Sequence, residues 1–312
     1  EQILKNLIMN KKFRIGSGIL VVVALFMILG SGCKGGKKAQ QEEVKVDMGN
    51  NAAILEDIKR AEKVFQALPS PLESAMLIKS AGAGFDQKLL NPVSNVNNYV
   101  TNKSMALNLG IYTCDLSFAS LYEQTQLLID YMEAAKKMAD GLGILRAIDQ
   151  EDIDELEENI NNSEVIMRIV SETFMNSNSY LEENGQPATA AMVLVGGWIE
   201  GLYISTKLVD MKTFDGNKLI GRIIDQKLSI DILLNLLSGS KGNPAVDELM
   251  IEVSKLKKVF DKIKINTSPV RPEYDEASRT TVLKSEVNTD MTPEIFRELA
   301  SVASEIRNSF VK

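Results

Sequence analysis

Residues 188–205 read ATAAMVLVGGWIEGLYIS and contain one charged side chain, that of Glu200. A helix that is apolar around its whole circumference is typical of a protein core or of a membrane span. Glycine in a helix interior costs roughly 1 kcal/mol relative to alanine, so Gly196, Gly197 and Gly201 require a compensating contact. The spacing of Gly197 and Gly201 predicts a neighbouring helix at close range. We therefore expect a buried central helix; the alternative is a membrane-spanning dimer helix, against which Glu200 and the short apolar length argue.

The rest of the folded chain is predicted to surround this segment with further helices. All eight prolines fall at the edges of apolar-periodic segments, as helices require, because proline breaks a helix interior. We expect helices over residues 51–68, 71–82, 96–121, 123–142, 150–161, 163–184, 188–211, 217–238, 244–265 and 293–311. The predicted fold class is all-α, either an antiparallel helical bundle or stacked helical hairpins.

Two boundaries divide the predicted helical chain. A helical domain is expected over residues 51–265, followed by a linker or extended segment over 266–292 and a C-terminal helix over 293–312. Residues 280–287 are the one strand candidate, with an extended loop as an equal alternative. Short apolar matches also suggest an internal duplication, in which residues 51–142 and 150–238 would be two tandem four-helix units.

Composition excludes several classes of function. The 312 residues include 35 basic and 42 acidic side chains, a net charge of −7, and no histidine. Catalysis by Ser–His–Asp or Cys–His groups and imidazole metal sites are therefore excluded, and the acidic charge argues against nucleic acid as a partner. The acidic run 151–158 lacks the glycine and ligand spacing of a calcium loop. We predict no catalytic residue, no metal ligand and no cofactor, and a non-enzymatic function is favoured over an enzyme.

The N-terminal residues have the pattern of an export signal. Lys11, Lys12 and Arg14 precede an unbroken apolar run over residues 19–29, after which small residues follow. This combination is typical of a secretory signal peptide. We assign the signal peptide to residues 1–32, or to 9–32 if translation starts at the methionine at position 9.

The end of this signal resembles a known processing motif. Gly30-Ser31-Gly32-Cys33 is similar to the lipobox of bacterial lipoproteins, although leucine is usual at the position of Gly30. The resemblance implies a diacylglycerol thioether and an N-acyl chain such as palmitate on Cys33, which together give stable membrane attachment. The alternative is an uncleaved membrane anchor. Residues 33–50 would form a flexible tether, and Lys34 favours the outer membrane, with the domain in the periplasm or at the cell surface.

One predicted helix carries candidate binding residues. On the segment 96–121 a polar and aromatic stripe is bordered by apolar residues on both sides, and it comprises Asn108, Tyr112, Asp115 and, just beyond its end, Tyr122. The stripe is interpreted as a pocket wall; the alternative is a polar seam satisfied by neighbouring helices.

Two residues of the central segment complete this hypothesis. Glu200 and the single tryptophan, Trp198, would face the stripe, and a buried Glu200 needs a partner or a raised pKa. Two functions follow. The first is a lipid-anchored envelope protein that binds or scaffolds a protein partner. The alternative is a small-ligand carrier or enzyme with a pocket between residues 96–121 and 188–211.

Overall fold

The structure is a computed structural model that describes residues 68–148, 150–160, 162–267, 271–275, 280–284 and 287–312. The predicted signal peptide, Cys33, the tether over 33–50 and nearly all of the helix predicted at 51–68 lie outside the described residues.

The described chain is an all-α bundle, which confirms the predicted fold class. Its helices are α4 (Pro71–Ser80), α5 (Asn102–Leu121), α6 (Thr125–Gly141), α7 (Gln150–Glu158), α8 (Ser163–Glu183), α9 (Pro187–Lys207), α10 (Lys218–Ser238), α11 (Pro244–Phe260) and α12 (Pro293–Phe310). Short 3₁₀ turns join them, namely η3 (Gln87–Leu89), η4 (Val93–Asn98), η5 (Leu145–Ala147) and η6 (Met211–Thr213).

Local sequence explains where these helices begin. Ser70 and Glu73 form a capping box at the start of α4, with the Ser70 hydroxyl accepting from Glu73 N at 3.2 Å and the Glu73 carboxylate accepting from Ser70 N at 2.7 Å. Asn243 and Thr292 cap α11 and α12 in front of a proline at the first helical position. The helix predicted at 96–121 begins later than expected, because α5 starts only after its own cap at Thr101.

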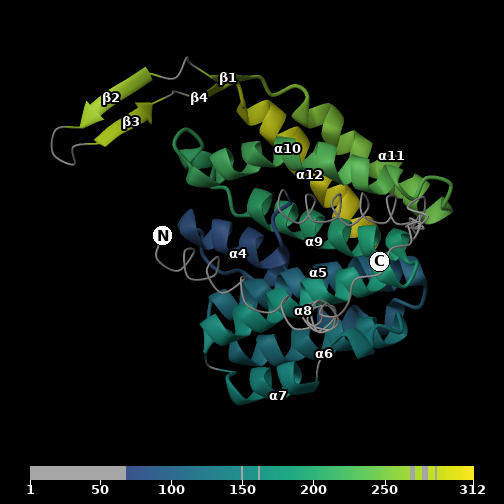
Figure 1. Cartoon of the computed structure of the whole chain (residues 1–312). Helices are drawn as coiled ribbons and strands as arrows, with labels where there is room; N and C mark the ends of the chain where they lie inside the picture. The colour runs from purple at the N-terminus through teal and green to yellow at the C-terminus, as the bar shows by residue number, and fades with distance from the viewer. Residues whose placement is uncertain (1–67, 149, 161, 268–270, 276–279, 285–286) are drawn as a thin grey trace, which may run out of the picture. The chain divides into compact units, whose positions relative to one another are not determined.

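The central helix is α9, as predicted. It packs against α4, α5, α8, α10 and α12, and every residue from 189 to 202 is buried. Among the described helices it alone is long and apolar enough to cross a membrane, and its burial inside the bundle accounts for that composition. Figure 1 shows α9 next to α5 within the bundle.

Glycines bring the backbones of α5 and α9 together. A Cβ atom at Gly110 would lie 2.0 Å from the Val193 carbonyl oxygen, and one at Gly196 would lie 2.0 Å from the Leu107 carbonyl oxygen. At Gly201 the neighbour is α4, because a Cβ there would lie 2.9 Å from Ser74 Cβ. The predicted close approach of helices at this glycine cluster is therefore confirmed.

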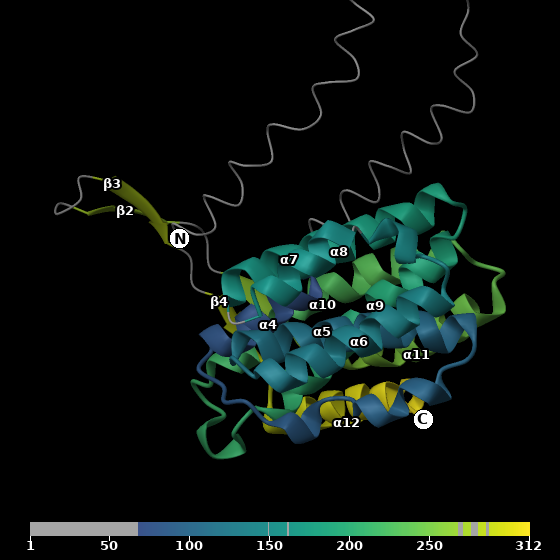
Figure 2. The ribbon, with the colours of Figure 1, turned by 90° about the horizontal axis from the view of Figure 1, so that it is seen from below.

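The pair α5 and α9 runs parallel. The Thr189 hydroxyl donates to Asn102 Oδ1 at 3.2 Å near the start of both helices, and Gly201 lies near Cys114 towards the end of both. In contrast, α5 and α6 are joined by only three residues and pack as an antiparallel hairpin (Figure 2). Residues 109–112 and 195–198, which are among the short apolar matches that suggest the duplication, thus lie side by side on parallel helices, while the duplication itself stays a prediction.

The segment predicted as a linker contains paired strands. β1 (Ile265–Thr267) pairs with β4 (Val287–Thr289), and between them β2 (Arg271–Asp275) pairs with β3 (Thr280–Lys284), both antiparallel. The strand candidate at 280–287 is thereby realised as β3 and the first residue of β4. The described residues between α11 and α12 thus include extended, hydrogen-bonded strands, while the linker assignment over 266–292 stays a prediction.

Candidate functional site

The predicted stripe on α5 forms a hydrogen-bonded polar seam. Asp115 Oδ2 accepts from the backbone N of Asn91 at 3.0 Å, and Asn108 Oδ1 accepts from Asn91 Nδ2 at 3.1 Å. Asn108 Nδ2 also donates to the Phe310 carbonyl at 2.9 Å, and the Tyr112 hydroxyl donates to the Pro92 carbonyl at 3.3 Å. Protein partners therefore occupy these polar groups except Asp115 Oδ1, which makes no hydrogen bond, and this favours the seam over the pocket wall.

Glu200 has the partner that its burial requires. Arg307 of α12 donates from Nε to Glu200 Oε2 at 2.8 Å and from Nη2 to Oε1 at 3.0 Å. Glu200 is fully buried and Arg307 is 6% exposed. The guanidinium also lies 4.7 Å from the centre of the Tyr203 ring. This bidentate, charge-assisted pair joins the last helix to the central one.

The seam holds two buried carboxyl groups, those of Asp115 and Glu200, beside one buried cation, Arg307. Both residues are fully buried, and Asp115 Oδ1 makes no hydrogen bond. Burial, together with the Glu200 charge, raises the pKa of Asp115 well above its usual value. Burial also raises the pKa of Glu200, and the Arg307 guanidinium opposes that rise. One buried cation balances one carboxylate, so Asp115, whose pKa is raised well above its usual value, carries a proton.

This protonation state predicts a pH dependence of stability. Because the pKa of Asp115 is raised on folding, the folded chain holds a proton that the unfolded chain releases above about pH 4. The contribution of this proton to stability is complete below that pH and is lost as the pH rises towards the raised pKa, by up to about 1.4 kcal/mol per pH unit.

Asp115→Asn tests the sign of this effect. An asparagine amide oxygen can accept from Asn91 N as Asp115 Oδ2 does, but the amide cannot ionise. Urea unfolding at pH 5, 6 and 7 should show the variant gaining stability relative to the wild-type chain at each step. Parallel curves for the two proteins would contradict a proton on Asp115.

The two remaining predicted residues lie apart from this seam. Trp198 donates from Nε1 to Gln226 Oε1 at 2.9 Å, towards α10. Tyr122 packs its ring 4.9 Å from that of Phe118 and 5.6 Å from that of Phe85. The structure does not bring these two aromatic rings together with Asp115. The backbone contact of α5 with α9 also leaves no space for a ligand around Gly110, so the pocket predicted between these two helices is absent at that level.

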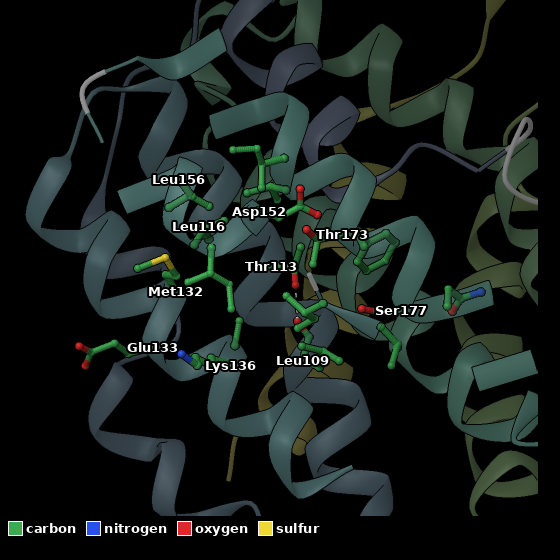
Figure 3. A pocket seen from close by; sticks show the side chains of 18 of the residues that line it. Leu109, Thr113, Leu116, Met132, Glu133, Lys136, Asp152, Leu156, Thr173 and Ser177 are labelled. Atoms are coloured by element: carbon green, nitrogen blue, oxygen red, sulfur yellow. Dashed lines mark hydrogen bonds between the residues drawn. The ribbon is translucent and has the colours of Figure 1, made fainter. Parts of the chain in front are cut away.

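A cavity lies on the other side of α5. It has a volume of about 460 Å³ and is lined mainly by α5, α6, α7 and α8, with Val193 of α9 also contributing (Figure 3). Its lining is mainly aliphatic and aromatic, with contributions from Leu109, Leu116, Ile129, Met132, Ile148, Ile153, Leu156, Ile160, Ile169, Val170, Phe174, Leu181 and Val193. A cavity of this size and composition is typical of a site for a small apolar molecule.

Helical periodicity explains how four helices share this lining. On α8 the lining positions are 169, 170, 173, 174, 177, 178 and 181, which follow one face of a helix. On α5 they are 109, 113 and 116, again one face. α5 therefore turns its polar seam towards α12 and its other side towards the cavity.

Polar groups in the cavity are few. Figure 3 shows the hydroxyl groups of Thr113 and Ser177 among the apolar side chains, and the Asp152 carboxylate beside Thr173. Thr113 Oγ1 donates to the Leu109 carbonyl at 2.7 Å. The charged lining residues on α6, Glu133 and Lys136, are exposed.

One lining residue stands out because its polar atoms have no partner. Asn178 is 1% exposed, and neither its Nδ2 nor its Oδ1 makes a hydrogen bond. A buried, unpaired amide costs free energy, so its persistence in a lining indicates that a ligand or water completes its hydrogen bonds.

Sequence reasoning missed Arg307 and Asn178, although both carry the same signal. Arg307 follows Ala303 by four positions and precedes Phe310 by three, on the buried stripe of α12. Asn178 follows Phe174 by four and precedes Leu181 by three on α8. A polar residue at an apolar position of a helical stripe predicts a buried polar group that needs a partner.

Neither similarity to known proteins nor the geometry of the described residues assigns a reaction to this site. No protein-family model, curated protein or solved structure matches the chain. Within the part of the chain that the structure describes, no three Cys, Asp or Glu side chains lie close enough to hold a metal ion.

Proposed function

We propose that this protein is a non-enzymatic binding protein that holds a small apolar molecule between α5, α6, α7 and α8 while tethered to an envelope membrane through Cys33. The cavity carries the proposal. Its volume of about 460 Å³ falls in the range of roughly 300–1,000 Å³ typical of small-molecule sites.

Binding is favoured over catalysis by the chemistry of the lining. Its lining groups are mostly aliphatic, aromatic, hydroxyl or amide, and the charged ones are those of Glu133, Lys136 and Asp152. Cys114 follows the lining residue Thr113 directly in the sequence but is buried outside the lining. Burial raises the pKa of its thiol well above the usual value. A thiol that stays protonated is a poor nucleophile.

The tether is supported by the lipobox resemblance at Gly30-Ser31-Gly32-Cys33. A membrane-attached carrier has direct access to molecules that partition into the bilayer, which makes an apolar cavity and a lipid anchor consistent with one role. Metabolic labelling with palmitate should mark the wild-type chain and leave Cys33→Ala unmarked in the soluble fraction. Labelling of both proteins, or of neither, would contradict the tether.

Displacement of a fluorescent apolar probe tests the cavity. N-phenyl-1-naphthylamine should bind the full chain with increased fluorescence, and Ser177→Phe should weaken its affinity at least tenfold because the phenyl ring fills the space that Ser177 lines. Ligand binding should also raise the free energy of unfolding of the wild-type chain, by about 2.7 kcal/mol when the ligand is at 100 times its dissociation constant.

A matched variant separates filling the cavity from damage to α8. Ser179 lies two positions further along the same helix and is exposed outside the lining, so Ser179→Phe should bind the probe as the wild-type chain does. Failure of the wild-type chain to bind, or equal binding by a folded Ser177→Phe chain, would overturn the proposed site. Circular dichroism of each variant reports whether it is folded.

A further inference from the structure

We infer that the ligand is an elongated apolar molecule with one uncharged hydrogen-bonding group, of the long-chain alcohol, ester or amide kind, and that Asn178 binds this group. The inference rests on the proposed function, since it names the ligand class of the same cavity. It is carried by the shape of the lining, by the unpaired amide and by the position of the charges.

The lining is long along α8. From Ile169 to Leu181 the stripe covers twelve residue steps, which at 1.5 Å per residue is about 18 Å. The side chains along it are mostly apolar and include Val170 and Phe174. A chain-like molecule therefore fits this space better than a compact, polar one.

The amide of Asn178 offers both kinds of hydrogen bond. Its Nδ2 is a donor and its Oδ1 is an acceptor, and both are buried and unpaired. Among the described buried side chains, it is the one amide group in which both atoms lack a partner. A hydroxyl group can use both atoms, as can a primary amide, while an ester carbonyl can accept from Nδ2.

The positions of the charged lining residues argue against a charged ligand group beside Asn178. The α8 face that includes Thr173, Ser177 and Asn178 carries no charged residue, and the lining contributes charges from Glu133, Lys136 and Asp152 on α6 and α7. A carboxylate, phosphate or ammonium group beside Asn178 would be buried without a counter-charge, which is strongly unfavourable. The group that Asn178 binds is therefore neutral.

A thermodynamic cycle tests the role of Asn178. Competition of 1-decanol and of decane against the fluorescent probe is measured for the wild-type chain and for Asn178→Leu. We expect Asn178→Leu to weaken decanol about tenfold and to leave decane unchanged or tighter, because only decanol loses a hydrogen bond. Equal changes for both competitors would overturn the inference, and would instead indicate that a trapped water satisfies Asn178.

Two further measurements keep the test decisive. Asn176→Leu places the same substitution on the exposed side of α8 and should leave both affinities unchanged. In the wild-type chain at pH 8, decanoate should compete at least tenfold more weakly than decanol, and tighter binding of decanoate would overturn the inference even if Asn178→Leu does not fold. If no competitor displaces the probe from the wild-type chain, the proposed function fails instead.

Discussion

Arg307→Ala is expected to destabilise the fold by about 3–5 kcal/mol, the cost of leaving a buried charge without its partner. Glu200 is fully buried, and Arg307 makes two hydrogen bonds to it, at 2.8 and 3.0 Å. Removing the guanidinium leaves Glu200 and Asp115 side by side with no cation between α5, α9 and α12. Urea unfolding at pH 7, followed by circular dichroism, measures the loss.

The same seam explains why the effect should extend to the C-terminus. Arg307 Nη2 also donates to the Leu89 carbonyl at 3.3 Å, and nearby Asn108 donates to the Phe310 carbonyl. These bonds attach α12 to the segment before α5, through Leu89, and to α5 itself, through Asn108. Hydrogen exchange should therefore show faster exchange of α12 amides in Arg307→Ala than in the wild-type chain.

Two controls separate the buried pair from ordinary surface charge. Arg297→Ala removes an exposed arginine of the same helix, whose carboxylate partner Glu294 is also exposed, and should change stability by less than about 0.5 kcal/mol. Arg307→Met combined with Glu200→Gln removes both charges and should recover a large part of the loss. A single Arg307→Ala variant as stable as Arg297→Ala would show that the pair contributes nothing.

The second large effect is expected at the contact of α5 with α9. Gly110→Ala and Gly196→Ala each place a Cβ atom 2.0 Å from a backbone carbonyl oxygen of the facing helix. A backbone cannot rotate away as a side chain can, so the two helices must move apart and lose packing along their length. We expect a loss of about 3 kcal/mol for either variant, at the upper end of overpacking effects.

Gly221→Ala is the matched control for these substitutions. Gly221 lies inside α10, and a Cβ there would meet nothing within 4 Å. Alanine should therefore stabilise the chain by up to about 1 kcal/mol through helix propensity alone. Thermal unfolding of the three variants should give shifts of opposite sign, and a gain in stability for Gly110→Ala would contradict the close contact.

Some features of the fold were predictable because they depend on neighbouring residues only. The capping box at Ser70 and the caps at Asn243 and Thr292 are local, and all three place helix starts as expected. The glycines of α9 predicted a closely packed neighbouring helix, because no interaction within α9 itself offsets the free-energy cost of glycine in a helix interior. In contrast, the paired strands within 266–292 depend on contacts between separated segments, and sequence indicated only an extended candidate at 280–287.

The candidate site was predicted less well, for a physical reason. The stripe with Asn108 and Asp115 was recognised as buried and polar, but its partners could not be deduced from spacing along one helix. Arg307 lies 107 positions from Glu200 and comes from a helix that the sequence separates from the main domain. The ligand site was expected between residues 96–121 and 188–211, whereas the cavity is lined mainly by α5, α6, α7 and α8, with Val193 from α9.

Sequence alone therefore determined the all-α class, most helix ends and the burial of α9, because periodicity, caps and prolines act over a few residues. The tertiary structure decided that α5 and α9 lie parallel, that Arg307 reaches Glu200, and that four helices leave a cavity beside Asn178. Those outcomes depend on how side chains from distant parts of the chain pack together. The sequence of one segment does not specify which side chains will pack against it or how large they are.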